Sequence, residues 1–321
     1  MSSEFELIAK YFTRPVANAV LGVGDDCALI RISSSCELAV STDTLVSGIH
    51  FFPDANAEKL GHKALAVNLS DLAAMGALPR YVLLALTMPK VDESWLAQFS
   101  RGFLRLASDN GVELIGGDTT RGPLSMTLTV MGEVAVGCAL RRDGAQDGDD
   151  IWVSGDLGAA ALAFKHLQGS IALQHDVFSA AVERLYCPSP RVVLGRALIG
   201  IATSAIDVSD GLVADLGHIC ERSGLSAQVQ LGSVPVFSAL RSFDTAIQTT
   251  CALAGGDDYE LCFTAPVSMR PRVSRTSADV GLTLTRIGCM RQGANRVHWL
   301  NGHGEEVPIA LSGFDHFPSE R

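Results

Sequence analysis

The sequence predicts an α/β (α+β) protein built from two mixed α/β domains. Strand-like runs of apolar residues alternate with helical patterns along the chain, which favours layered α/β architecture over an all-helical or all-β fold. The 321 residues suffice for two domains, and a hydrophobic content of 47% provides a sizeable core. The Asp- and Gly-rich segment RRDGAQDGDD (141–150) marks the boundary, so the expected domains are 1–140 and 141–321.

The first domain is expected to begin with a helix at 3–12. Two more helices are expected at 57–75 and, after the break at Pro89, at 92–109. Apolar and β-branched runs predict the strands of this half, at 27–32, 37–43, 81–88 and 125–134.

The second domain is expected to start with the strand pattern IWVSG at 151–155. Helical patterns follow at 158–167, 176–186, 190–201 and 211–223. Further strands are predicted at 204–209, 226–231, 260–265 and 282–288.

The composition excludes several classes of protein. A formal net charge of −10 argues against a nucleic-acid partner, because phosphates would be repelled without a basic patch. No apolar run approaches the length of a membrane span, and Glu4 and Glu6 stand where a signal peptide would be basic. The eight cysteines form no C-x-x-C pair, which indicates free thiols in a reducing compartment. We therefore expect a cytoplasmic protein with no membrane partner.

Common nucleotide-binding motifs are missing, but aspartates recur in a distinctive way. No G-x-x-x-x-G-K-[ST] loop is present, and GVGDDC (22–27) departs from a dinucleotide fingerprint at Cys27. The aspartates stand beside Gly, which allows close backbone approach, or beside Ser and Thr, whose oxygens suit Mg²⁺. Each segment alone would be an ordinary turn, but together they suggest a cation site at strand ends and turns. The six segments are GDD (24–26), STDT (41–44), NLSD (68–71), GGDT (116–119), DVSDG (207–211) and GGDD (255–258).

The helical pattern around Asp71 leaves two interpretations open. At helical spacing, Ala64, Val67 and Asp71 share one face, and a carboxylate on an apolar face should be neutralised or hold a metal. Alternatively, Ser70 or Asp71 caps a short second helix, LAAM.

Backbone geometry adds three expectations about the other segments. In an extended backbone, only one residue of each doublet, Asp25–Asp26 and Asp257–Asp258, can face a shared site. Asp207 should end a strand while Ser209 caps the next helix, whose N–H groups would seat a phosphate. The backbone amides of Gly116–Gly117 could bind phosphate in the same way.

Seven motifs occur in order along the chain: GVGDDCALI, STDTLVSGIHF, KALAVNLSDLAAMGALP, LIGGDTTRGPLSMT, SAIDVSDGL, GGDDYELCFT and GFDHF. Together they closely resemble the thiamine-monophosphate kinase family, which belongs to the aminoimidazole ribonucleotide synthetase superfamily. The match runs from about residue 4 to 317 and so covers nearly the whole chain.

The resemblance implies ATP-dependent phosphorylation of thiamine monophosphate to thiamine diphosphate, with ATP as co-substrate and several Mg²⁺ ions as cofactors. It also implies a homodimer whose N-terminal domains pool strands into a shared β-barrel, with the C-terminal α+β domain completing the active-site cleft. Residue by residue, it implies Mg²⁺ ligands at Asp26, Ser41, Thr42, Asp43, Asp71, Asp118, Asp207 and Asp210, ATP contacts at Gly117, Arg142 and Ser209, and substrate contacts at His50, Asp257, Leu311 and Phe314.

Two positions depart from the family pattern. Asp257 stands where the family usually has a Glu, which is one methylene longer, and Leu311 stands where a Trp is common. Ring stacking on the substrate would then have to come from Phe314.

The acidic charge fits this activity only if cations are present, because ATP and a phosphate monoester are anions that carboxylates repel. Several Mg²⁺ ions would reverse that repulsion. We expect direct in-line transfer without a protein general base, since a phosphate monoester has a second pKa of about 6 and is largely ionised near pH 7. The alternatives are a catalytically silent nucleotide- or Mg²⁺-binding regulator, or another ATP-dependent enzyme of the superfamily.

Overall fold

The computed structural model of the chain describes residues 4–314 and divides into two compact units. Among the described residues, the first unit comprises 4–72 and 77–137, and the second comprises 73–76 and 138–314. The main boundary between the units therefore follows Gly137, just ahead of the expected boundary segment 141–150. The functional roles expected of the two domains remain predictions.

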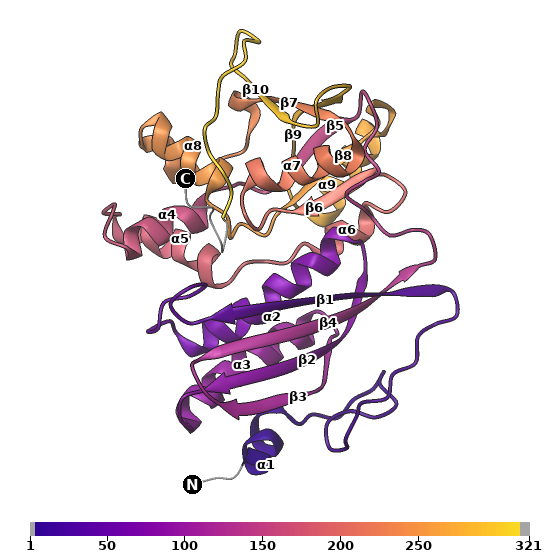
Figure 1. Cartoon of the computed structure of the whole chain (residues 1–321), viewed down its shortest axis with the longest axis vertical. Coiled ribbons are helices and arrows are strands. Elements are labelled where there is room, and N and C mark those ends of the chain that lie inside the picture. Colours follow the sequence, from indigo (N-terminus) through magenta and orange to yellow (C-terminus); the bar gives the residue numbers. More distant parts are fainter. Residues whose placement is uncertain (1–3, 315–321) are drawn as a thin grey trace. The chain divides into compact units, whose positions relative to one another are not determined.

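The first unit is a four-stranded sheet in the order β1-β4-β2-β3, with α2 and α3 against one of its faces (Figure 1). Strand β4 pairs antiparallel with both β1 and β2, and β2 pairs parallel with β3. The elements are α1 (Glu4–Leu7), which continues into a π-helical turn η1 (Ile8–Phe12), β1 (Cys36–Val46), α2 (Ala57–Ala74), β2 (Leu78–Met88), α3 (Glu93–Asp109), β3 (Glu113–Arg121) and β4 (Ser125–Ala135).

Local sequence explains how this unit forms. Along β4, Met126, Leu128 and Val130 are buried while the residues between them are half-exposed, so the apolar alternation covers the helix-facing side of the sheet. Helix α3 begins after Asp92, whose carboxylate accepts the N–H of Trp95 and so caps the helix.

Three expectations about the first unit are wrong. Residues 27–32 form no strand, because their loop is tied only by the bridge between Leu21 and Leu29. The segments 41–44 and 116–119, expected at strand ends or turns, lie inside β1 and β3. Pairing with β4 and β2 keeps both segments extended in spite of their Gly and Asp content.

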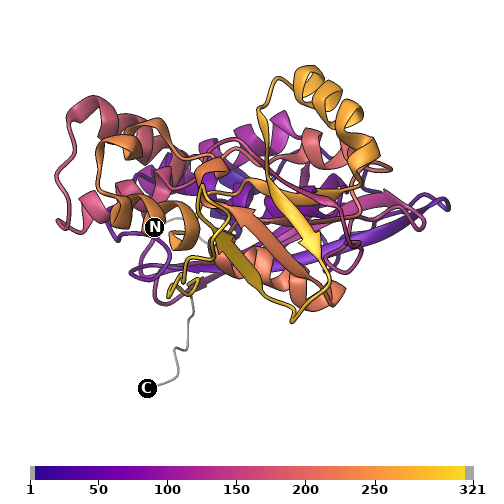
Figure 2. The same ribbon diagram turned by 90° about the horizontal axis from the view of Figure 1, so that it is seen from above.

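The second unit is a six-stranded sheet in the order β10-β7-β9-β5-β8-β6. Helices α4, α5 and α8 gather on one side of this unit (Figure 1 and Figure 2). The elements are β5 (Asp150–Ser154), α4 (Ala159–Leu167), α5 (His175–Tyr186), α6 (Val192–Ala197), β6 (Ser204–Asp207), α7 (Leu212–Ser223), β7 (Ser226–Gln230), 3₁₀ turns η2 (Leu231–Ser233) and η3 (Ser238–Ser242), α8 (Thr245–Ala254), β8 (Leu261–Ala265), a 3₁₀ turn η4 (Val267–Met269), α9 (Arg270–Val280), β9 (Leu284–Arg291) and β10 (Val297–Leu300).

The core of the second unit lies between β5, β6, β7 and β9 and the buried face of α7. Side chains such as Ile151, Ile206, Leu216 and Ile287 are almost completely buried there. This packing holds the carboxyl end of β6, where the candidate site residues Asp207, Ser209 and Asp210 follow one another.

The second unit also differs from expectation in places. The helix expected at 190–201 is limited to α6, and α8, α9 and β10 were not predicted. Helix α9 is polar and buries only Val273 and Thr276, so its sequence carries little apolar periodicity. Within residues 4–314, none of the helices has both the length and the apolar character needed to cross a membrane.

Candidate active-site residues

Asp71 lies inside α2 and faces β1. The helix runs unbroken from Ala57 to Ala74, so the interpretation of Ser70 or Asp71 as the cap of a second helix is wrong. Ala64 and Val67 are 0% and 5% exposed, which confirms that Asp71 continues a buried helix face. The Oγ of Ser41 donates a hydrogen bond of 2.5 Å to Oδ2 of Asp71. A half-buried carboxylate is thus held against the sheet by a hydroxyl group.

The alternation of β1 separates Thr42 from its neighbours. The main-chain N–H of Asp43 donates to Oδ1 of Asn68 on α2 at 3.2 Å. The side chains of Ser41 and Asp43 point to one face of the strand and that of Thr42 to the other. Thr42 Oγ1 instead lies 2.8 Å from Thr129 Oγ1 on β4. The structure therefore does not bring the Thr42 hydroxyl together with Ser41 and Asp71.

Asp118 and Gly117 lie on the opposite edge of the same sheet. In register, Asp43 pairs with Leu128, Leu128 with Leu84, and Leu84 with Gly117. Three strand spacings, roughly 14 Å, separate β1 from β3 across this row. Gly117 has a φ of 149°, and an added Cβ would lie 1.8 Å from the carbonyl oxygen of Leu84, so no other residue fits.

Asp26 and His50 lie in loops of the first unit. Asp26 is exposed, and its N–H donates to Oδ1 of Asp25 at 3.0 Å. His50 follows β1 in a turn, where its Nδ1 accepts the N–H of Val46 at 3.0 Å. In the neutral ring, this bond places the proton on Nε2 and makes that nitrogen a donor.

In the second unit, DVSDG forms a tight loop around a carboxylate that the sequence reasoning missed. Oδ2 of Asp215 accepts the N–H groups of Ser209, Asp210 and Gly211 at 3.0, 3.1 and 3.1 Å. The N-cap of α7 is Gly211, so the expectation that Ser209 caps this helix is wrong. Asp215 takes the N–H groups that were expected to seat a phosphate. The available sequence signal was an acidic residue in the first turn of α7.

Burial governs the protonation of this loop. Desolvation, together with the charges of Asp207 and Asp210, raises the pKa of Asp215 to about 8. Asp207 is itself buried, at 3% exposure, at the end of β6. Such a concentration of carboxylates favours protonation or the approach of a cation.

The segment 255–260 joins α8 to β8 and has an unusual backbone. Asp257 and Tyr259 have φ angles of 61° and 50°, a left-handed conformation that costs a non-glycine residue roughly 1–3 kcal/mol. Their N–H groups donate to the carbonyl oxygens of Ser209 and Val208, both at 2.8 Å. Tyr259 Oη donates to Oδ1 of Asp257 at 3.0 Å. The loop that carries Asp257 is thereby tied to the DVSDG loop.

Asp257 and Asp258 face different surroundings, but not because the backbone is extended. The two side chains diverge where Asp257 has a left-handed φ, so the expectation of an extended backbone at this doublet is wrong. Both carboxylate oxygens of Asp258 accept the N–H of Gly158, at 2.9 and 3.1 Å. Complete burial raises the pKa of Asp258 well above the usual range.

The remaining predicted residues of the second unit lie on its loops. Arg142 is exposed, and its carbonyl oxygen accepts the hydroxyl of Ser223 at 2.9 Å. Leu311 is half-buried. Phe314 is 53% exposed, and its N–H donates to the carbonyl oxygen of Asp210 at 3.2 Å. The rest of the GFDHF motif, 315–317, lies outside the described residues.

The candidate metal ligands lie in several separate segments of the chain. Within the described part of the chain, no group of three or more His, Cys, Asp or Glu side chains is close enough to hold a metal ion. Mg²⁺ sites in kinases characteristically use one or two carboxylates together with phosphate oxygens and water. The pair Ser41–Asp71 and the carboxylates of Asp207 and Asp210 are oxygen donors of that kind.

Comparisons with known proteins agree with this arrangement of motifs. Residues 24–134 match the family described as AIR synthase related protein, N-terminal domain, which defines the class of the first unit. The chain is 45% identical over 319 residues to the thiamine-monophosphate kinase of Salmonella typhimurium, covering 98% of both chains. It therefore belongs to the thiamine-monophosphate kinase family.

Two solved structures extend the comparison to the fold. The thiamine-monophosphate kinase from Stenotrophomonas maltophilia K279a superposes with a TM-score of 0.84 at 48% identity, covering 90% of this chain and 92% of that one. AaThiL complexed with AMPPCP and TMP gives a TM-score of 0.78 at 29% identity and covers 89% of both chains. These structures confirm the mixed α/β architecture.

Proposed function

We propose that the protein transfers the γ-phosphoryl group of ATP to thiamine monophosphate and releases thiamine diphosphate. The observation that carries this proposal is the 45% identity to a thiamine-monophosphate kinase over 98% of both chains. It is supported by the fold shared with AaThiL, which was solved with TMP and with AMPPCP, an analogue of ATP. The predicted aspartates would supply oxygen donors of the kind that such a reaction needs.

The residues fit the Mg²⁺ ions that the family implies. Asp71 is a carboxylate on an otherwise buried helix face, a position that a cation would compensate. When bound, Mg²⁺ would neutralise the phosphates and stabilise the charge that develops in phosphoryl transfer. The chain would hold the ions through Asp26, Ser41, Thr42, Asp43, Asp71, Asp118, Asp207 and Asp210, where Thr42 would have to contribute through its main chain because its hydroxyl faces Thr129.

The chain's own residues would orient the reactants rather than exchange protons with them. Ser41 fixes the carboxylate of Asp71 through its hydrogen bond. The bond from Val46 to Nδ1 places the proton of the neutral His50 ring on Nε2, and that nitrogen would donate to a substrate phosphate oxygen. The acceptor phosphate is largely ionised at pH 7, since its second pKa is about 6, so direct in-line transfer needs no protein base. Gly117, Arg142 and Ser209 would contact ATP, and Asp257, Leu311 and Phe314 would contact the rest of the substrate.

We further propose that the active protein is a homodimer in which sheet edges of two copies meet. Within one copy, Asp43 on β1 and Asp118 on β3 belong to opposite edge strands, so one ion cannot bridge them across the sheet. Pairing β1 of one copy next to β3 of another would bring the two carboxylates into one site. Such a closed assembly would also remove exposed strand edges.

The direct test is an assay of purified protein with ATP, Mg²⁺ and thiamine monophosphate, with the product identified by mass spectrometry. We expect thiamine diphosphate and ADP in equal amounts, and none after EDTA. Binding of ATP without any turnover would favour the silent-regulator alternative. Trapping of a labelled phosphoenzyme from ATP alone would contradict direct transfer.

A further inference from the structure

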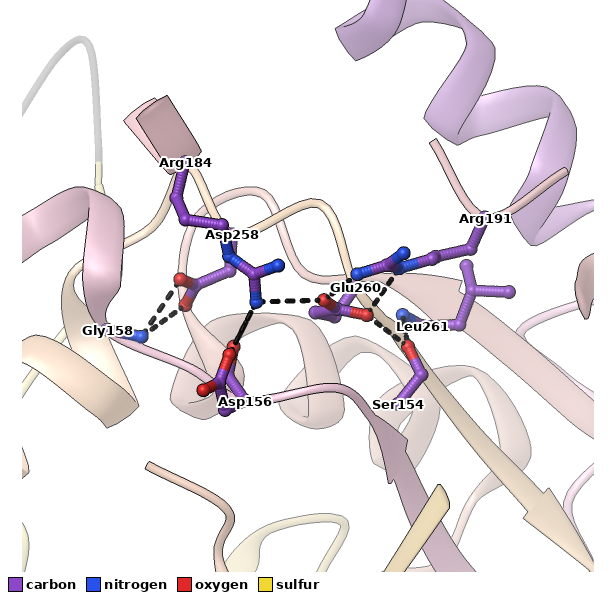
Figure 3. A network of polar contacts seen from close by, with 8 residues as sticks. All are labelled: Ser154, Asp156, Gly158, Arg184, Arg191, Asp258, Glu260 and Leu261. Atoms are coloured by element: carbon purple, nitrogen blue, oxygen red, sulfur yellow. Dashed lines mark hydrogen bonds and ion pairs between the residues drawn. The ribbon is translucent and has the colours of Figure 1, made fainter. Parts of the chain in front are cut away.

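Glu260 is buried immediately before β8 and is held by two arginines. Its carboxylate accepts Nε of Arg191 at 2.7 Å and also Nη2 of Arg191, which makes a bidentate ion pair (Figure 3). Nη2 of Arg184 lies 3.5 Å from the same carboxylate, whose side chain is only 1% exposed. Bidentate guanidinium pairs fix orientation as well as charge.

The same carboxylate is locked to the end of β5. Ser154 Oγ donates to Oε2 of Glu260 at 2.5 Å and accepts the N–H of Leu261 at 2.9 Å. Gly155 follows with a φ of 61°, and a Cβ there would lie 2.2 Å from Oε1 of Glu260. Only glycine allows the carboxylate to approach the strand end this closely.

A second attachment lies two residues earlier in the chain. The carboxylate of Asp258 accepts the N–H of Gly158, at the start of α4. Arg184 pairs both with Glu260 and with Asp156, which lies between Ser154 and Gly158 in the chain (Figure 3). The chain on both sides of Tyr259 is therefore fastened to the segment after β5.

Asp257 lies at the edge of this fastened segment, where its main chain is hydrogen-bonded to the DVSDG loop. Its N–H donates to the carbonyl oxygen of Ser209, and its carboxylate accepts the hydroxyl of Tyr259. Asp257 and Tyr259 are the two residues of the loop with left-handed φ angles. We propose that Arg191 is a positioning residue: by clamping Glu260 it holds segment 255–260, and with it Asp257, in the conformation that binds the phosphate-acceptor substrate. The inference rests on the proposed function for the role of Asp257.

A matched network at the other end of β5 offers a control. Asp150, whose side chain is 2% exposed, accepts Nε and Nη2 of Arg270 at 2.6 and 2.8 Å. A second guanidinium, that of Arg286, lies 3.3 Å from it. Asp150 and Ser154 are the two ends of β5, four residues apart, or roughly 13 Å along the strand. Both networks bury one carboxylate between two arginines, but only that of Glu260 adjoins segment 255–260.

The test compares Arg191→Lys with Arg270→Lys. Lysine keeps the charge but loses the bidentate fork in both variants. We expect Arg191→Lys to raise the KM for thiamine monophosphate about tenfold while the KM for ATP and kcat change less than about threefold. Amide hydrogen exchange at Asp257 and Tyr259 should accelerate about tenfold. Arg270→Lys should change neither the KM nor these exchange rates.

Each outcome of this comparison supports or overturns the positioning role of Arg191. Equal effects of the two lysine variants would reduce Arg191 to a general stabilising residue and overturn the proposal, as would unchanged exchange at Asp257 in Arg191→Lys. If Arg191→Lys does not fold, Ser154→Ala removes one bond to Glu260 and should move the same two readouts in the same direction. If the wild-type protein does not phosphorylate thiamine monophosphate, the proposed function fails, while the exchange comparison still tests the clamp.

Discussion

The hydroxyl of Ser41 donates a 2.5 Å hydrogen bond to the carboxylate of Asp71, across 30 residues of sequence. This bond joins the middle of an edge strand to the last turn of helix α2, which is otherwise buried along the same face. It explains how a charged residue is tolerated among Ala and Val side chains. It also places Ser41 and Asp71, two of the proposed metal ligands, on the same side of the sheet.

Asp71→Asn should abolish Mg²⁺-dependent turnover and leave the fold intact. The amide keeps the shape and the bond to Ser41 but removes the charge that would hold a cation. We expect kcat/KM to fall at least about 100-fold, or roughly 2.7 kcal/mol. The melting temperature should change little, which circular dichroism can measure. A melted Asp71→Asn protein whose refolded fraction is fully active would show that Asp71 is only structural.

Ser41→Ala and Thr42→Val should differ sharply although the residues are neighbours. Ser41 shares the face of Asp71, whereas the Thr42 hydroxyl lies against Thr129 on the other face. We expect kcat to fall about tenfold in Ser41→Ala and less than about threefold in Thr42→Val. Steady-state kinetics at saturating Mg²⁺ measures both. A larger loss in Thr42→Val would mean that its side chain acts directly.

Mixing two inactive variants should restore activity if the site is completed by a second copy. Asp43→Asn and Asp118→Asn alter opposite edges of the sheet. After unfolding and joint refolding, half of the dimers are mixed and each has one intact site, so about a quarter of wild-type activity should return. Refolding each variant alone is the control. Absence of recovery in demonstrably mixed dimers would contradict a site shared between two copies.

The rate at which each cysteine is alkylated should decrease with the burial of its thiol. Desolvation raises the pKa of Cys251 to about 11 and that of Cys220 to about 12, so at pH 8 about one thousandth or less of these thiols is ionised. Cys27 and Cys138 are exposed and should react first with iodoacetamide. Mg²⁺ with ATP should slow Cys27, the neighbour of Asp26, and leave Cys138 unchanged. Peptide mass spectrometry resolves each site, and equal protection of both would argue against a metal at Asp26.

The metal-free protein should lose stability as the pH rises from about 4 to about 8. In the folded state, burial raises the pKa of Asp215 to about 8, whereas an unfolded Asp titrates near 3.9. In this window the folded protein keeps a proton that the unfolded chain has lost, so the free energy of unfolding falls with pH. Asp215→Asn should flatten the slope, and so should Mg²⁺. Urea unfolding at several pH values measures how the free energy of unfolding depends on pH. The same dependence in Asp215→Asn as in the wild type would exclude Asp215 as its cause.

Several features followed from local sequence. The strands around 81–88 and 125–134 were predicted because both are runs of apolar and β-branched residues. The helix face that unites Ala64, Val67 and Asp71 followed from spacing alone, and the ordered motifs identified the family. These properties depend on neighbours a few residues apart, which is the distance over which sequence patterns carry information.

Tertiary structure alone decided the rest. Gly116–Gly117 became part of a strand because β2 pairs with it, and Asp215, not Ser209, satisfies the N–H groups before α7. Nothing in the order of residues reveals that Arg191 and Glu260, 69 positions apart, form one buried ion pair. Local propensity selects helices and strands, but hydrogen bonds between distant segments are made only when the chain has collapsed. Those long-range contacts determine which of the many aspartates are held in place and which way each one points.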